Sequence, residues 1–170
     1  QAMQRGVMYG NTDVTPESFT GIAPRFNTVS TATAATAANV IDAGGTGSTN
    51  TSIWLIGWGE NTVHGIYPKG SQAGLVHKDL GEGDAFDASG NRFRALMDQY
   101  QWKAGIAVKD WRYIVRIANI DVTTLTKNAA SGADIIDLMT QALELIQGLT
   151  GVTPVFYVSR RIRSFLRRQT

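Results

Sequence analysis

The sequence of 170 residues contains no cysteine. This absence excludes disulfide bonds, thiolate metal sites and a cysteine nucleophile together. No apolar run approaches the ~20 residues that a membrane-spanning helix needs, so the sequence predicts no membrane partner. Residues 1–5 also lack the charged-then-apolar layout of a signal peptide. A hydrophobic content of 43% with 18% charged residues is instead typical of a folded globular protein with few surface charges.

The motifs of common enzymes are missing as well. The glycine-rich stretch at residues 43–48 is not followed by the Lys-Ser/Thr pair of a phosphate-binding loop, and the next predicted element is a strand. No Gly-x-Ser-x-Gly sequence is present to hold a serine nucleophile on a strained turn. We therefore predict that the protein is not an enzyme and has no catalytic residues.

The two histidines, His64 and His77, are the only imidazoles. Three acidic residues follow nearby, so a metal site of histidine and carboxylate ligands is conceivable: Asp79, Glu82 and Asp84. The histidines do not have the spacing of common zinc motifs, and the glycines between the acidic residues favour a flexible segment. We favour the interpretation as solvated loop residues, and predict no metal and no cofactor.

The last third of the chain has the clearest pattern. Residues 133–146 place apolar side chains at helical spacing, with Ser131 or Asp134 available to cap the helix. Residues 152–158 form a short run of β-branched and aromatic residues, which predicts a buried strand. A second helix is predicted from Ser159 to Gln169. This helix–strand–helix unit is typical of a scaffold that forms a core.

The second of these helices contains a dense group of basic residues: Arg160, Arg161, Arg163, Arg167 and Arg168. The net charge of the whole chain is only +2, so the positive charge is concentrated at this end. Three interpretations stay open: a solvated face, ion pairs with acidic residues of neighbouring subunits, or non-specific contact with a polyanion. We rank the first two equally and the third below them, because aromatic residues for base stacking are not interleaved.

The middle of the chain predicts a β-rich region with many of the 18 glycines. Residues 52–58 read as a strand, residues 59–61 as a hairpin turn, and residues 62–67 as the returning strand. A second pair of strands is predicted around a turn at residues 87–91, and further strands at 102–109 and 113–120. The strand-like positions of Trp54, Trp58, Trp102 and Trp111 favour packing, although a sugar-binding groove is the alternative.

Several stretches resemble the tailed-bacteriophage major capsid proteins of the HK97-like fold, in particular a podovirus and prophage subgroup. Residues 8–12 (MYGNT) with 19–22 (FTGI) resemble the end of the long spine helix and the loop after it. Residues 133–136 (ADII) and 155–160 (VFYVSR) resemble the opening helix and the following strand of the axial domain. Three further segments resemble the inserted β region of the subgroup: residues 39–47 (NVIDAGGTG), 51–55 (TSIWL) and 110–120 (DWRYIVRIANI).

The resemblance implies an α+β fold and a division into three parts. These are the spine-helix end and loop (1–29), an inserted β-rich lobe (30–125) and the helix–strand–helix core of the axial domain (126–170). Full subunits of the family begin with an N-terminal arm and a long hairpin, the E-loop, and return with further strands after the axial domain. We therefore expect this chain to be a fragment, monomeric on its own, with sequence missing at both ends.

The resemblance also implies the function and its partners. The protein is expected to be a structural coat protein made in the bacterial host cytoplasm, and to assemble into an icosahedral virion shell of hexamers and pentamers around DNA. Identical subunits are the main partners, with non-specific contact to packaged DNA and a possible scaffolding protein. The alternative function is a carbohydrate-binding or carbohydrate-active β-rich domain. We predict that the five arginines of residues 160–168 contact neighbouring subunits, with a second patch of Trp111, Arg112 and Arg116.

Overall fold

The computed structural model describes residues 2–16, 18–29, 33–70, 74–125 and 134–169. The chain divides into two compact units, which are residues 1–64 with 106–170, and residues 65–105. Helices and strands are mixed throughout, so the α+β fold class is confirmed. No described helix has the length and apolar character needed to cross a membrane.

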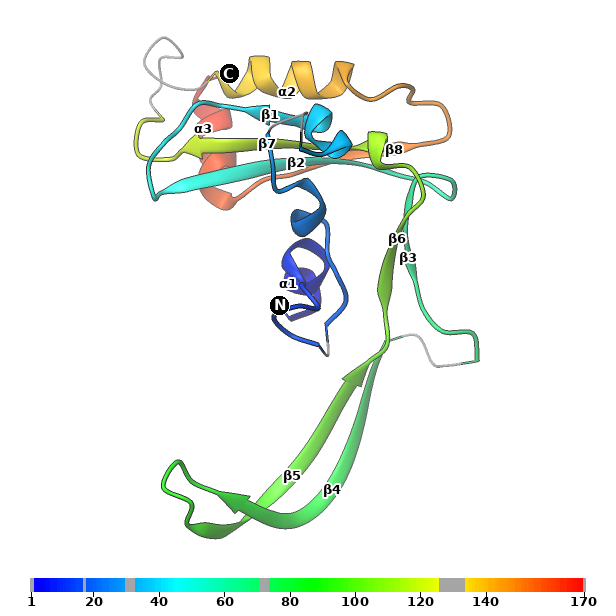
Figure 1. Cartoon of the computed structure of the whole chain (residues 1–170), viewed down its shortest axis with the longest axis vertical. Helices are drawn as coiled ribbons and strands as arrows, with labels where there is room; N and C mark the ends of the chain where they lie inside the picture. The colour runs from blue at the N-terminus through cyan, green and yellow to red at the C-terminus, as the bar shows by residue number, and fades with distance from the viewer. Residues whose placement is uncertain (1, 17, 30–32, 71–73, 126–133, 170) are drawn as a thin grey trace. The chain divides into compact units, whose positions relative to one another are not determined.

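A sheet organises the first unit (Figure 1). Its central strand is β2 (Asn50–Trp58), which pairs antiparallel with β7 (Ile114–Asp121) on one edge and with β8 (Thr153–Tyr157) on the other. Strand β1 (Val40–Asp42) lies parallel to β7 at the outer edge. The strand order continues from β2 to β3 (Val63–Ile66) and β6 (Gly105–Val108).

Both faces of this sheet are covered at β2 and β7. On one face, Ile53 and Leu55 pack with Val115 and Ile117 against the helices α2 (Ile135–Glu144) and α3 (Arg160–Gln169). The other face packs against Ile22 and Phe26 from the N-terminal part of the chain. It is formed by alternate residues of the two strands: Trp54 and Ile56 on β2, and Ile114 and Ala118 on β7. A strand covered on both faces must be apolar at successive positions, which explains the nearly continuous apolar runs of β2 and β7.

The N-terminal part contains α1 (Ala2–Tyr9) and the short 3₁₀ helix η1 (Ala23–Phe26), and η2 (Ala35–Asn39) leads into β1. Helix α1 ends at Tyr9, and the amide of Gly10 donates to the carbonyl of Gly6 at 2.9 Å. The helix–strand–helix pattern of the last third is also confirmed. The carboxylate of Asp134 caps α2 by accepting from the amide of Asp137, and Ser131 lies outside the described residues.

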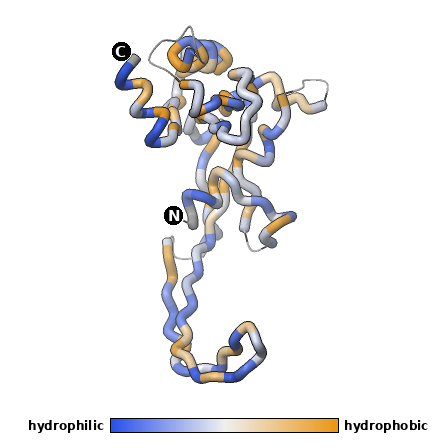
Figure 2. Tube along the Cα trace, turned by 90° about the vertical axis from the view of Figure 1, so that its left-hand side faces the viewer, coloured by the Kyte–Doolittle hydropathy of each residue, from blue (hydrophilic) through white to orange (hydrophobic). Residues whose placement is uncertain are grey.

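The second unit is mainly a long two-stranded ribbon. Strands β4 (Leu75–Phe86) and β5 (Arg92–Trp102) pair antiparallel, as predicted around the turn at residues 87–91. The carboxylate of Asp87 closes this turn by accepting from the amides of Ser89 and Asn91. Most residues of both strands are exposed, including large apolar ones, and Figure 2 shows hydrophobic and hydrophilic positions along them.

The predicted hairpin at residues 59–61 is wrong. Strands β2 and β3 meet only at Trp58 and Val63, and this pair is parallel. An antiparallel return strand would need a free edge of β2, but β7 occupies one edge and β8 the other. The hydroxyl of Thr62 donates to the carbonyl of Gly57 at 2.8 Å and holds the chain in a tight turn instead.

Two neighbouring isoleucines of α2 test how the helix contributes to the core. Ile135 is fully buried, whereas Ile136 is 44% exposed. Ile135→Ala should lower the free energy of unfolding by about 2 to 5 kcal/mol, because it leaves a cavity under the sheet. Ile136→Ala is the matched control and should change it by less than about 0.5 kcal/mol. Urea denaturation followed by circular dichroism measures both, and equal effects would contradict the observed orientation of α2.

Candidate functional site

The five predicted arginines all lie on α3 with exposed side chains. The opposite side of the helix is anchored by Ile162, which is fully buried, and by the partly buried Phe165 and Leu166. None of the five guanidinium groups forms an ion pair with a described carboxylate: the ion pairs of the described chain involve other cations. The helix therefore presents a strongly basic surface whose charge is not balanced by contacts within the described chain.

Two of these arginines nevertheless contact their own chain. The Nη2 of Arg161 donates to the carbonyl of Val122 at 3.5 Å, which links α3 to the end of β7. The guanidinium of Arg168 lies 5.7 Å from the ring centroid of Phe165, within the range of a cation–π contact. The remaining three, Arg160, Arg163 and Arg167, have side chains with no such contact to the described chain.

The second predicted patch is not a continuous exposed surface. Trp111 is partly buried against the core and belongs to the 3₁₀ helix η3 (Trp111–Tyr113), so the predicted strand position is wrong for this residue. Arg112 is exposed and pairs with Asp110 at 2.9 Å. The hydrogen bond from the Arg112 side chain lowers the pKa of Asp110, and the carboxylate also caps η3.

Arg116 points into the first unit. Its Nη1 donates to the carbonyl of Phe26 at 2.7 Å, and its Nε donates to the hydroxyl of Ser52 at 3.1 Å. The guanidinium lies 5.2 Å from the ring centroid of Trp54, its partner across the sheet. Burial lowers the pKa of Arg116 from its usual range. These contacts give Arg116 a role in joining the sheet to the N-terminal segment.

The two histidines lie on different strands. His64 is on β3, and its Nδ1 is a buried atom without a hydrogen-bond partner. His77 is on β4, where its Nε2 is 2.8 Å from the carboxylate of Asp98 and its ring stacks on Tyr100. Within the described ranges, no group of three or more His, Cys, Asp or Glu residues is placed to hold a metal ion.

Three of the four tryptophans are buried or partly buried and lack the open ring face that sugar stacking requires: Trp54, Trp58 and Trp111. Trp54 is only 2% exposed and packs edge-on against Phe26. The indole of Trp58 donates to the hydroxyl of Tyr157 at 2.9 Å. Trp102 is half exposed on β5, in the other unit. Nothing in the described part of the chain favours the carbohydrate-binding alternative.

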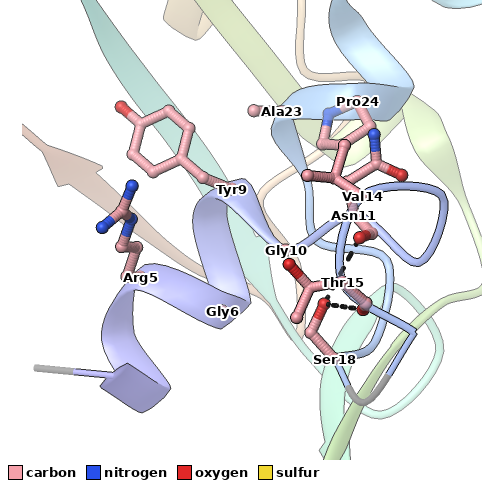
Figure 3. A pocket seen from close by; sticks show the side chains of 10 residues that line it. All are labelled: Arg5, Gly6, Tyr9, Gly10, Asn11, Val14, Thr15, Ser18, Ala23 and Pro24. Atoms are coloured by element: carbon pink, nitrogen blue, oxygen red, sulfur yellow. Dashed lines mark hydrogen bonds between the residues drawn. The ribbon is translucent and has the colours of Figure 1, made fainter. Parts of the chain in front are cut away.

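An open hollow of about 700 Å³ lies between α1 and the loop after it (Figure 3). Among its described lining residues, Arg5 and Tyr9 are titratable, and the others are Gly6, Gly10, Asn11, Val14, Thr15, Ser18, Ala23 and Pro24. The hydroxyl of Ser18 donates to the carbonyl of Thr15 at 2.8 Å and thereby holds the loop. No carboxylate or imidazole is among these residues to act as a general base.

The apolar exposure of β4 and β5 was not predicted from the sequence. Phe86 is 67% exposed and Leu96 is 81% exposed. One signal was available, because β4 contains two glycines and four charged residues within twelve positions, which is poor composition for a buried strand.

Comparison with protein families supports one assignment. The family described as major capsid protein GP7 matches residues 1–170, which is the whole chain. A search among curated proteins found no match.

Arg116 distinguishes a structural role from a role in subunit contacts. Arg116→Ala should lower the free energy of unfolding by about 1.5 to 3 kcal/mol, because two hydrogen bonds from a charged, partly buried donor are lost. Arg112→Ala is the control and should cost less than about 1 kcal/mol, since its ion pair is exposed. Chemical denaturation measures both. An Arg116→Ala protein of unchanged stability that fails to assemble would instead support the predicted interface role.

Proposed function

Because the matching family covers every residue, the chain belongs to the major capsid protein GP7 family, and we propose that it builds its shell through two surfaces of the subunit. Membership makes it a structural capsid protein that assembles with identical subunits in the virion. The first proposed contact surface is the arginine face of α3. The second is the exposed ribbon of β4 and β5.

The arginine face supports this proposal through its unbalanced charge. Five guanidinium groups on ten residues repel one another, and no described carboxylate lies within ion-pair distance of any of them. Arginine is well suited to ion pairs at interfaces because its planar group is weakly hydrated and donates several hydrogen bonds. Acidic groups of neighbouring subunits are the partners we propose, and packaged DNA is a further, non-specific one.

The β4–β5 ribbon (residues 75–102) supports the proposal through its exposed apolar side chains. A two-stranded sheet is at best marginally stable in water when nothing covers it. Both of its arginines are paired within the ribbon, in the contacts of Arg92 with Asp84 and of Arg94 with Glu82. Large exposed apolar groups beside such paired charges are suited to burial against another protein surface. We propose that a neighbouring subunit covers them.

We further propose an HK97-like subunit, with residues 1–29, 30–125 and 126–170 as the spine-helix end, inserted lobe and axial core. Hexamers and pentamers of such subunits would close an icosahedral shell around DNA. The subunit would be made in the bacterial host cytoplasm, with a scaffolding protein as a candidate helper. We propose no enzyme activity. The family match carries the function, and the resemblance described above supports the finer assignments.

Charge reversal on α3 tests the first surface. A triple variant tests this: replacing Arg163, Arg167 and Arg168 together by Glu should block shell formation in the full-length protein, because attraction to a neighbour becomes repulsion. Replacing the same three residues by Lys keeps the charge and is the control. Electron microscopy and sedimentation measure particles, and circular dichroism measures the fold. Normal particles from the folded triple Glu variant would remove the proposal for this helix.

Leu96→Asn tests the second surface. The side chain is 81% exposed, so the free energy of unfolding of the subunit should change by less than about 0.5 kcal/mol. Particle yield should fall, because apolar surface buried between subunits is lost. Gln99→Asn on the same strand changes no apolar group and should leave the yield unaltered. Equal yields from both variants in negative-stain images would count against a covered ribbon.

A further inference from the structure

The charges of the two helices on one face of the sheet are segregated by sign. Helix α2 carries Asp137 and Glu144 and no basic residue, whereas α3 carries its five arginines and no acidic residue. Both helices pack against the same apolar cluster through their other sides. Their outer sides are therefore oppositely charged surfaces of one subunit.

The charged positions on the two helices also have the same spacing. On α2, an acidic stripe of exposed residues occupies positions i, i+3, i+4 and i+7: Asp137, Thr140, Gln141 and Glu144. On α3, an arginine stripe occupies positions i, i+3 and i+7: Arg160, Arg163 and Arg167. Seven residues are close to two turns and roughly 10.5 Å along a helix axis, so the end charges of both stripes are equally far apart.

The helix dipole explains only two of the four end charges of the stripes, because Asp137 lies in the first turn of α2 and Arg167 in the last turn of α3. The helix dipole favours acidic residues in the first turn and basic residues in the last turn. Glu144 is instead the last residue of α2, and Arg160 is the first residue of α3. Each of these two charges therefore lies at the unfavourable end of its own helix, which suggests that a partner outside the helix compensates it.

Contacts within the subunit do not compensate them either. The carboxylate of Asp137 accepts only from the side-chain amide of Gln141, a neighbour on the same stripe, and from no cation of the described chain. No described ion pair includes Glu144 or a residue of the arginine stripe. By contrast, Arg161 and Arg168 outside the stripe both contact their own chain.

We propose that the acidic stripe of α2 in one subunit docks against the arginine stripe of α3 in a neighbouring copy of the same chain. The inference rests on the proposed function. Two helices packed side by side bring both end charges of one stripe within reach of both end charges of the other. We take the contact as head-to-tail, with one α2–α3 pair between neighbours, and its repetition forms a closed ring when the rotation between neighbours closes. Single exposed ion pairs contribute little, but repetition over a shell multiplies them.

Reciprocal charge reversal in the full-length protein tests this contact. Arg160→Glu with Arg167→Glu reverses the arginine stripe, and Asp137→Arg with Glu144→Arg reverses the acidic stripe. Each pair alone should reduce the yield of particles roughly tenfold or more, because every ring contact becomes repulsive. The protein with all four substitutions should assemble again, since opposite charges face each other once more. Sedimentation and electron microscopy measure the yield.

A matched control has the same charge change elsewhere in the first unit. Arg5→Glu with Lys109→Glu should leave most of the yield, because both exposed residues lie outside the proposed contact surfaces. A loss as large as that of the stripe variant would show that total charge matters and would overturn the proposal. The proposal would also be overturned if both single-stripe variants fold and the protein with all four substitutions still does not assemble. This outcome requires that the unaltered protein forms particles under the same conditions. An unaltered protein that forms no particles would instead contradict the proposed function.

Neutral variants keep the test decisive if reversal impairs folding. Arg160→Gln with Arg167→Gln, and Asp137→Asn with Glu144→Gln, remove the attraction without adding repulsion. If the stripes contact each other, the protein with all four neutral substitutions should lose no more yield than either two-residue variant. Either variant alone already removes the interaction between the stripes, so the second pair of substitutions has nothing further to remove. Losses that multiply would show two independent contacts and would overturn the pairing.

Discussion

The structure depends on the complete enclosure of β2. Strands β7 and β8 occupy its two edges, and apolar clusters cover its two faces. A strand without a free edge or a solvent face can be stable only if its side chains are apolar at successive positions. This requirement explains the run from Ile53 to Ile56 and directs the polar sides of α2 and α3 outward. The surfaces proposed for assembly are thus a consequence of how the core is closed.

The last third of the chain could be predicted from the sequence because its signals are local. The apolar stripe of α2, the β-branched run of β8 and the apolar positions of α3 each lie within one element. The relation of β2 to β3 could not be predicted in this way. It depends on β8, which arrives about a hundred residues later along the chain and takes the edge that a hairpin would use.

The candidate site was predictable only to the level of charge. The sequence shows five arginines, but which of them contact their own chain depends on the positions of Val122 and Phe165. Arg116 shows the same limit more clearly. A basic residue in a strand favours a solvent-exposed interpretation, yet the register places Arg116 opposite Trp54 and beside the carbonyl of Phe26. Tertiary packing gave that side chain an interior role.

The separation between core and surface has a physical consequence for a shell protein. The first unit obtains its stability from apolar side chains such as Ile53, Ile117 and Ile162, which are at most 1% exposed. The charges of α2 and α3 contribute little to that stability because they lie outside the core. Contacts between subunits can therefore be weak and reversible while each subunit stays folded, which allows misplaced copies to dissociate before a lattice closes. Charged stripes suit this requirement because their attraction is specific in direction and sensitive to ionic strength.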